Sequence, residues 1–110
     1  MPVFCREIRW YMDIEKAEIN DHHELTKLTL RSKAHWGYPA EQIKKWEKEL
    51  TITPKYIAEN KVFKLCIQGY IIGYYSYFKT EKNPVKLDNL FIAPEYIGMG
   101  FGKILMADFF

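Results

Sequence analysis

A glycine-rich turn near the end of the chain limits the possible folds more than any other part of the sequence. Leu87–Ile92 is a predicted strand that Pro94 ends, and glycines then alternate over residues 98–102 as G-x-G-x-G. An apolar helical pattern follows from Lys103. Glycine tolerates positive φ and has no Cβ to block a phosphate, and free N–H groups in such a turn and at a helix N-terminus attract anions. The segment therefore predicts a cradle for a pyrophosphate group.

Two other phosphate-binding motifs fit this segment less well. A P-loop needs a serine or threonine directly after its lysine, but Ile104 follows Lys103. A Rossmann dinucleotide fold needs G-x-G-x-x-G after a strand that opens a βαβ unit, whereas here the glycines are closer together and the strand follows a predicted hairpin. The spacing therefore disfavours a nucleotide-binding domain of the Rossmann type.

The rest of the chain divides into helical and strand patterns. Asp21 and Glu24 have capping-box spacing for a first helix that ends near Gly37. The Gln-Gly pair at 68–69 separates two β-branched and aromatic runs and predicts a hairpin. The expected order is β-α-α-β-β-β-α. Strands are expected over about 8–13 or 14–19, 62–67, 70–78 and 87–92, and helices over about 21–37, 39–50, 53–60 (a short turn) and from 103 onward.

Composition argues for one folded domain and against several classes of partner. The chain has 110 residues, of which 48% are apolar and 16% aromatic, enough for a hydrophobic core. The formal net charge of +2 offers no electrostatic basis for binding nucleic acid or an anionic membrane. No apolar run reaches the ~20 residues of a membrane span, and the N-terminal segment lacks the regions of a signal peptide. Cys5 and Cys66 are expected as reduced thiols of a cytoplasmic protein.

The glycine turn and its flanks resemble motif A of the GNAT acetyltransferases. Leu90–Pro94, the G-x-G-x-G turn over 98–102 and Ile104–Leu105 match that motif position by position. Farther upstream, Ile71–Tyr74 resembles the third strand of the family, and Ser32–Pro39 resembles the passage between its first two helices. The likeness therefore extends over most of the chain.

The resemblance implies a single acyl-CoA-binding domain over residues 1–110, of the α/β (α+β) class, with a mixed, mostly antiparallel sheet flanked by helices. The sequence departs from the family in two places. Ile97 stands where the family often has arginine or glutamine, and the chain stops at Phe110, inside the helix after the cradle. The family normally continues with another strand, a helix and a final strand or two, and that part usually carries a tyrosine that protonates the leaving thiolate. The C-terminal part of the fold is therefore expected to be missing.

By resemblance, the chain is expected to transfer an acetyl group from acetyl-CoA to a primary amine. Asp88 and Glu95 are candidate general bases, although each could equally be a solvated surface residue. Trp36 and Tyr38 are candidates for the acceptor site, with core packing as the simpler role. No metal is expected, because the histidines have no ligand spacing. The expected acetyl-CoA-binding residues are Leu90, Phe91, Ile92, Gly98, Met99, Gly100, Phe101, Gly102 and Lys103.

A second hypothesis is a truncated acyl-CoA-binding module that is catalytically weak or inactive and that associates with itself. Its basis is the apolar C-terminal segment, which no later element would cover in a monomer. The open edge of the sheet is a further surface that a second copy could cover. This hypothesis predicts a homodimer or another form of self-association. The apolar residues are Ile104, Leu105, Met106, Phe109 and Phe110.

Overall fold

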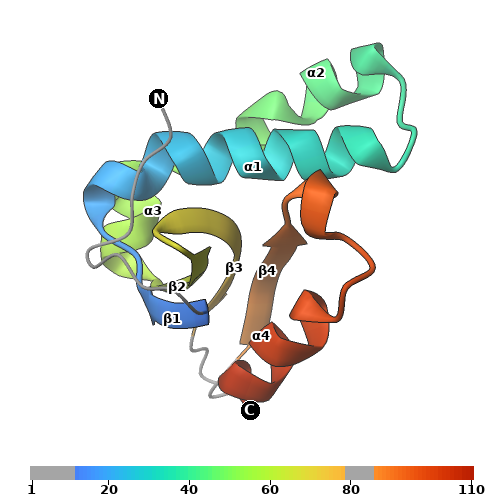
Figure 1. Cartoon of the computed structure of the whole chain (residues 1–110). Helices are drawn as coiled ribbons and strands as arrows, with labels where there is room; N and C mark the ends of the chain where they lie inside the picture. Colours follow the sequence, from blue (N-terminus) through green and yellow to red (C-terminus); the bar gives the residue numbers. More distant parts are fainter. Residues whose placement is uncertain (1–11, 79–85) are drawn as a thin grey trace.

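The computed structural model describes residues 12–78 and 86–110, which form a four-stranded sheet with helices on both faces (Figure 1). This arrangement confirms the expected α/β class with a sheet flanked by helices. The strands are β1 (Met12–Lys16), β2 (Lys61–Ile67), β3 (Tyr70–Phe78) and β4 (Lys86–Ile92). The helices are α1 (His22–His35), α2 (Ala40–Leu50), α3 (Pro54–Glu59) and α4 (Phe101–Phe109), with 3-10 turns at Ile19–Asp21 and Pro94–Tyr96.

The sheet has the order β1-β2-β3-β4, and each of its described pairings is antiparallel. The predicted hairpin joins β2 and β3 through Gln68 and Gly69, whose φ angles are 49° and 85°. Positive φ at both central residues gives the turn the same twist as the strands that it connects. β1 overlaps only the first part of the strand expected over 14–19, and most of the segment expected over 8–13 lies outside the described residues.

β4 contains a β-bulge at Asp88. Asn89 pairs with Ser76 of β3, whereas Leu87 pairs with the next residue, Tyr77. Asp88 is therefore the extra residue of the pair of strands. Side chains of consecutive strand residues normally alternate between the two faces of a sheet, and a bulge allows two of them to leave the strand on one side. After the bulge, β4 pairs regularly with β3 to the end of the strand.

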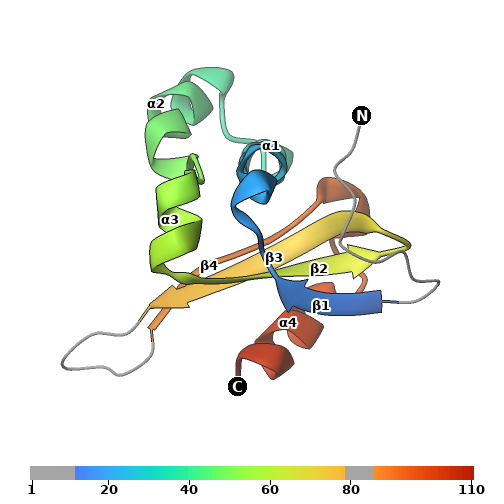
Figure 2. The ribbon, with the colours of Figure 1, turned by 90° about the vertical axis from the view of Figure 1, so that its left-hand side faces the viewer.

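The two faces of the sheet carry separate hydrophobic cores. Helices α1, α2 and α3 lie on one face and α4 lies on the other (Figure 2). The core under α1 and α3 includes Leu25, Ile57 and Tyr74, and the core under α4 includes Tyr75 and Leu105. Because successive strand residues point to opposite faces, Tyr74 and Tyr75 of β3 contribute one ring to each core. Among the described residues, no helix combines the length and the apolar character needed to cross a membrane.

A buried hydroxyl pair links α1 to β3. The Tyr74 side chain is 0% exposed, and its hydroxyl oxygen lies 2.6 Å from Oγ1 of Thr29. Thr29 donates its own hydroxyl proton to the backbone oxygen of Leu25 at 2.7 Å, so its oxygen is left to accept from Tyr74. Burial raises the pKa of Tyr74, which keeps this phenol protonated as the donor. Both buried hydroxyls are thereby satisfied.

A buried lysine ties the start of α1 to the sheet. Lys64 of β2 is 1% exposed, and its Nζ lies 2.8 Å from Oδ2 of Asp21 and 3.5 Å from Oε1 of Glu15. The Asp21 carboxylate also accepts a hydrogen bond from the Glu18 N–H. Asp21 is the N-cap residue of α1, but its side chain makes no cap bond to that helix. The expected capping box of Asp21 with Glu24 is therefore wrong, because the lysine and the preceding turn occupy the carboxylate.

Cys66 also differs from the sequence-based expectation. It lies in β2, is buried and is disulfide-bonded. The expectation of a reduced thiol at this position is therefore wrong, and Cys5 lies outside the described residues. The cytoplasmic location, which was inferred partly from reduced thiols, stays a prediction.

Candidate functional site

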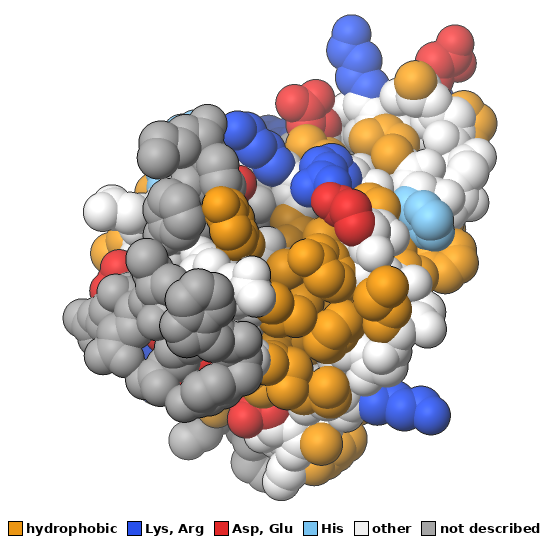
Figure 3. All heavy atoms as spheres, viewed as in Figure 1, with side chains coloured by type: hydrophobic (Ala, Val, Ile, Leu, Met, Phe, Trp, Pro, Cys, Tyr) orange, Lys and Arg blue, Asp and Glu red, His pale blue; other side chains and the backbone are white. Residues whose placement is uncertain are grey.

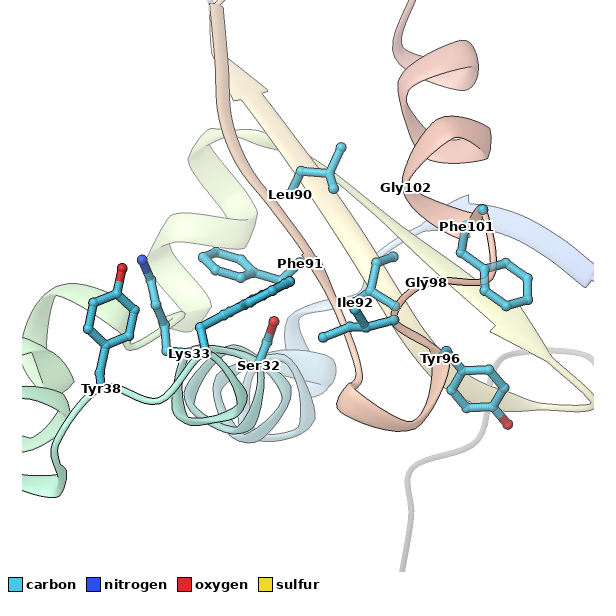
Figure 4. Close-up of a pocket in the computed structure, with 13 residues that line it drawn as sticks. Ser32, Lys33, Tyr38, Leu90, Phe91, Ile92, Tyr96, Gly98, Phe101 and Gly102 are labelled. Carbon is cyan, nitrogen blue, oxygen red and sulfur yellow. The ribbon is translucent and has the colours of Figure 1, made fainter.

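A cleft of about 320 Å³ opens where the end of α1, the end of β4 and the start of α4 meet (Figure 4). Hydrophobic side chains gather on this face of the molecule, between α1 and α4 (Figure 3). Small-molecule sites usually have this form, with apolar walls and a few polar groups. The lining residues come from three segments: Ser32, Lys33, Trp36 and Tyr38; Leu90, Phe91 and Ile92; and Tyr96, Ile97, Gly98, Gly100, Phe101 and Gly102.

The wall formed by β4 is an edge of the described sheet. Among the described strands, β4 pairs with β3 alone, so alternate backbone groups on its other side point away from the sheet. Gly73 of β3 lies behind this wall, opposite Ile92. A Cβ at Gly73 would lie 2.7 Å from Cδ1 of Ile92 and 3.0 Å from the backbone oxygen of Phe91. The absence of a side chain at Gly73 therefore allows the two strands to approach as closely as they do.

The glycine turn connects this wall to α4. Gly98 and Gly100 have φ angles of 86° and 89°, a region that residues with a Cβ rarely adopt. A Cβ at Gly98, Gly100 or Gly102 would meet no atom within 4 Å, so the backbone here is open to an approaching group. Gly100 is the N-cap residue of α4, and the first N–H groups of a helix have no partner inside it. The turn thus offers the open backbone and helix N-terminus that suit a phosphate.

Aromatic side chains and one lysine form the opposite wall. Trp36 and Tyr38 follow the end of α1 and are 64% and 42% exposed, so core packing does not account for them. The Nζ of Lys33 lies 5.6, 5.4 and 5.9 Å from the ring centroids of Tyr38, Trp46 and Phe91, respectively. These are cation–π distances. Lys33 was not predicted from the sequence, although it belongs to the matched segment between the first two helices.

The sequence pattern of the acetyltransferase (GNAT) family matches residues 19–109. The chain belongs to this family. The matched residues include the whole cleft, from the end of α1 to the start of α4. No curated protein matches the sequence.

Several solved structures share the fold at low sequence identity. PaiA N-acetyltransferase from Thermoplasma acidophilum, determined in complex with coenzyme A, has a TM-score of 0.74 and 21% identity, covering 88% of this chain and 68% of that chain. YjaB from Escherichia coli has a TM-score of 0.63 and 20% identity, covering 88% and 63%. The ribosomal-protein-S18-alanine N-acetyltransferase from Escherichia coli has a TM-score of 0.63 and 16% identity, covering 89% and 56%. The present chain thus spans between half and about two thirds of their lengths.

The structure of this GNAT chain brings most of the predicted site residues together. All the predicted acetyl-CoA-binding residues line the cleft except Met99 and Lys103. These two side chains are exposed and are next in sequence to residues that line it. The predicted acceptor-site residues Trp36 and Tyr38 line the same cleft. The two candidate bases, Asp88 and Glu95, do not line it. Within residues 12–78 and 86–110, no group of three or more His, Cys, Asp or Glu side chains could hold a metal ion.

Asp88 belongs to a polar cluster on β4, about 10 Å before Phe91 along the strand. Tyr56 of α3 donates its hydroxyl proton to Oδ2 of Asp88, and the same hydroxyl lies 2.8 Å from Oγ of Ser76 and 3.3 Å from Nδ2 of Asn89. Burial, and then the bond to Asp88, raise the pKa of Tyr56 to about 12. Tyr56 is therefore a protonated donor at neutral pH. No sequence signal indicated this cluster, because the bulge that turns Asp88 and Asn89 toward one hydroxyl depends on strand pairing.

Glu95 lies in the turn after β4 and forms an exposed ion pair with α1. Nη2 of Arg31 donates to both carboxylate oxygens of Glu95, and both side chains are more than half exposed. The hydrogen bond from Arg31 lowers the pKa of the Glu95 carboxyl. A lowered pKa makes this carboxylate a weaker proton acceptor than an unpaired glutamate.

Proposed function

We propose that this GNAT chain binds acetyl-CoA in the cleft and takes part in the transfer of its acetyl group to a primary amine. The observation that carries the proposal is the junction of an edge strand, an open glycine turn and a helix N-terminus at one apolar cleft. The family match supports it, as does the coenzyme A complex of the similar PaiA structure. We further propose that residues 1–110 act as one acyl-CoA-binding domain.

In this proposal the glycine turn and the start of α4 bind the pyrophosphate. Backbone N–H groups between Gly98 and Lys103 donate to the phosphate oxygens, and the positive end of the α4 dipole adds to the attraction. Lys103 contributes a positive charge in the first turn of α4. Met99 and Phe101 stand between the glycines of the turn and contact the cofactor there. The missing Cβ atoms at the glycines leave room for this approach.

The edge strand binds the pantetheine arm. Leu90, Phe91 and Ile92 line the cleft, and their outward backbone groups can pair with the amides of an extended ligand as they would with another strand. Bound acetyl-CoA supplies an acetyl group that the thioester activates. A backbone N–H at the end of β4 stabilises the negative charge that develops on the acetyl carbonyl oxygen. Trp36 and Tyr38 contact the acceptor amine on the opposite wall.

The acceptor amine must lose a proton before it attacks, and Asp88 and Glu95 are our candidate bases. Neither lines the cleft, so each would act through water. Asp88 is held in place by the Tyr56 hydroxyl, whereas the ion pair with Arg31 makes Glu95 less basic. We therefore favour Asp88.

A calorimetric titration of acetyl-CoA into the 110-residue chain tests the binding proposal, with CoA as a second ligand. Saturable binding of both is the expected result. A folded chain that binds neither would contradict the proposal. Competition by NAD or ATP, but not by CoA, would instead favour a nucleotide site of the Rossmann type.

Release of the CoA thiol in the presence of a panel of amines tests the transfer step. If Asp88 is the base, Asp88→Asn should lower the rate by roughly 10²-fold and leave the calorimetric affinity for CoA unchanged. An unchanged rate would remove Asp88 from this role and leave Glu95, which Glu95→Gln tests in the same way. Binding without turnover for any amine would contradict catalysis by this chain.

Self-association is a second proposal, linked to an inactive acyl-CoA-binding module. Phe110 is 89% exposed just after α4. The ring of its neighbour Phe109 packs against Tyr75, with 5.8 Å between the two ring centroids. Light scattering at micromolar concentration tests this proposal. A homodimer that binds acetyl-CoA without turnover would support the module, and a monodisperse monomer would contradict self-association.

A further inference from the structure

Lys33 brings a primary amine of the chain itself into the candidate acetyl-CoA cleft. We infer that Lys33 is an acceptor for the acetyl group, so that the chain acetylates its own side chain. Among the described residues that line the cleft, Lys33 is the one lysine. The inference rests on the proposed function, because it requires acetyl-CoA in this cleft.

Three aromatic rings hold the Lys33 ammonium group at the cleft. Its Nζ lies within 5.4 to 5.9 Å of the centroids of Tyr38, Trp46 and Phe91, which come from the α1–α2 connection, α2 and β4. Figure 4 shows the Lys33 side chain leaving α1 between Tyr38 and Phe91. Among the described residues, no carboxylate forms an ion pair with Lys33, whereas Lys27 pairs with Glu24. Rings attract the cation without committing it to a fixed hydrogen bond.

The position of Phe91 places this amine beside the strand that we assign to the pantetheine arm. Nζ of Lys33 lies 5.9 Å from the centroid of the Phe91 ring, and Phe91 and Ile92 line the cleft together with the glycine turn. A lysine side chain has four rotatable bonds, so rotation about them can carry Nζ along the cleft without a change in the backbone. An external acceptor would have to reach the same thioester from the same wall.

The proposed step balances with acetyl-CoA as the only co-reactant. Lys33 Nζ first loses a proton to water, and its lone pair then attacks the thioester carbonyl carbon. A C–N bond forms, the C–S bond breaks, and its electron pair leaves with the sulfur of CoA. The nitrogen gives up a second proton and the CoA thiolate takes up one, so the products are an acetamide on Lys33 and free CoA. Acetylation removes the positive charge and with it the cation–π contacts.

Peptide mass spectrometry of the full chain after incubation with acetyl-CoA tests the inference. Lys27 is the matched control, because it lies on the same helix and is 69% exposed. Acetylation of Lys33 should be at least about tenfold faster than that of Lys27, because the cleft holds both reactants together. Excess CoA should slow the reaction at Lys33 and leave the rate at Lys27 unchanged. Lys33→Arg should remove the fast modification, and Lys27→Arg should retain it.

A second readout does not depend on acetyl transfer by the chain. Acetic anhydride labels exposed amines in solution, and CoA in the cleft should slow the labelling of Lys33 but not that of Lys27. If calorimetry shows CoA binding but Lys33 is acetylated no faster than Lys27, the inference is overturned while the binding proposal stands, and protection from acetic anhydride then shows only that CoA covers Lys33. If calorimetry shows no binding of CoA or acetyl-CoA, the proposed function itself fails and the inference falls with it.

Discussion

The two ends of α1 each hold a lysine ammonium group, but with different partners. Near the start of the helix, Lys64 is buried against the carboxylates of Asp21 and Glu15. Near its end, Lys33 is half-buried among aromatic rings at the cleft. A buried ammonium group without its carboxylates, or a buried carboxylate without its ammonium group, is strongly unfavourable. A cation that moves away from rings at a surface loses little interaction energy. The first arrangement fixes the helix to the sheet, and the second leaves the Lys33 amine free to move among the rings.

The largest effect is expected from Lys64→Ala, which removes the buried ammonium group near the start of α1. The substitution leaves the buried Asp21 carboxylate without its cation, so the free energy of unfolding should fall by about 3–5 kcal/mol. Urea denaturation followed by circular dichroism measures this change. Lys27→Ala, which removes the exposed lysine of the pair with Glu24, should lower the free energy of unfolding by less than about 1 kcal/mol. Equal losses for the two variants would show that the buried pair has no special role.

A double variant separates the charge of this pair from its packing. Lys64→Met fills most of the lysine volume, and Asp21→Asn removes the opposite charge while its amide oxygen can still accept from the Glu18 N–H. The double variant should therefore recover much of the stability that Lys64→Ala loses. No recovery would mean that packing, rather than an unpaired charge, accounts for the loss.

The next largest effect is expected in the turn across the cleft from Lys33. Gly100→Ala places a residue with a Cβ at a backbone φ of 89°. This should lower the free energy of unfolding by about 1–2 kcal/mol and also weaken acetyl-CoA binding. Gly102→Ala adds a Cβ into open space, so it should weaken binding without lowering stability. Calorimetry and thermal unfolding of both variants measure the two effects. A normal affinity in both variants would contradict the role of this turn.

Lys33→Met tests how strongly the rings near the end of α1 hold the lysine. It removes the charge and keeps an apolar side chain of similar length among the rings, so stability should fall by about 1 kcal/mol or less. The measurement is the same urea denaturation as for Lys64→Ala. A loss as large as that of Lys64→Ala would show that the rings fix this lysine as firmly as the carboxylates fix the other.

The smallest effect is expected from Arg31→Ala, which removes the exposed pair with Glu95. Stability at neutral pH should fall by about 0.5 kcal/mol or less. Because Arg31 lowers the pKa of Glu95 in the folded state, the contribution is present above the pKa of the unfolded chain and is lost as the pH falls through the lower folded value. The free energies of unfolding of the unmodified protein and of Arg31→Ala should therefore converge in acid. A difference in stability that grows on acidification would contradict this account.

Local signals predicted the cleft wall that comes from one continuous segment. The strand, Pro94 and the alternating glycines lie within a few residues of one another, so turn chemistry and periodicity were sufficient for them. The contacts of Lys64 with Asp21 and of Tyr56 with Asp88 join residues far apart in the sequence, and only the packed sheet brings them together. The same limit explains why Asp21 was interpreted as a helix cap, since its local spacing carries no information about the lysine on β2. Lys33 was missed because its rings come from three separate elements.

The bulge at Asp88 has a consequence for how this chain can change over evolution. It takes up a one-residue difference in register between β3 and β4, and the residues after it keep their regular pairing. A single-residue deletion before the bulge can therefore be taken up by loss of the bulge, without moving Phe91 and Ile92 relative to the glycine turn. The bulge thus separates a one-residue change of length before Asp88 from the cleft-lining residues after it.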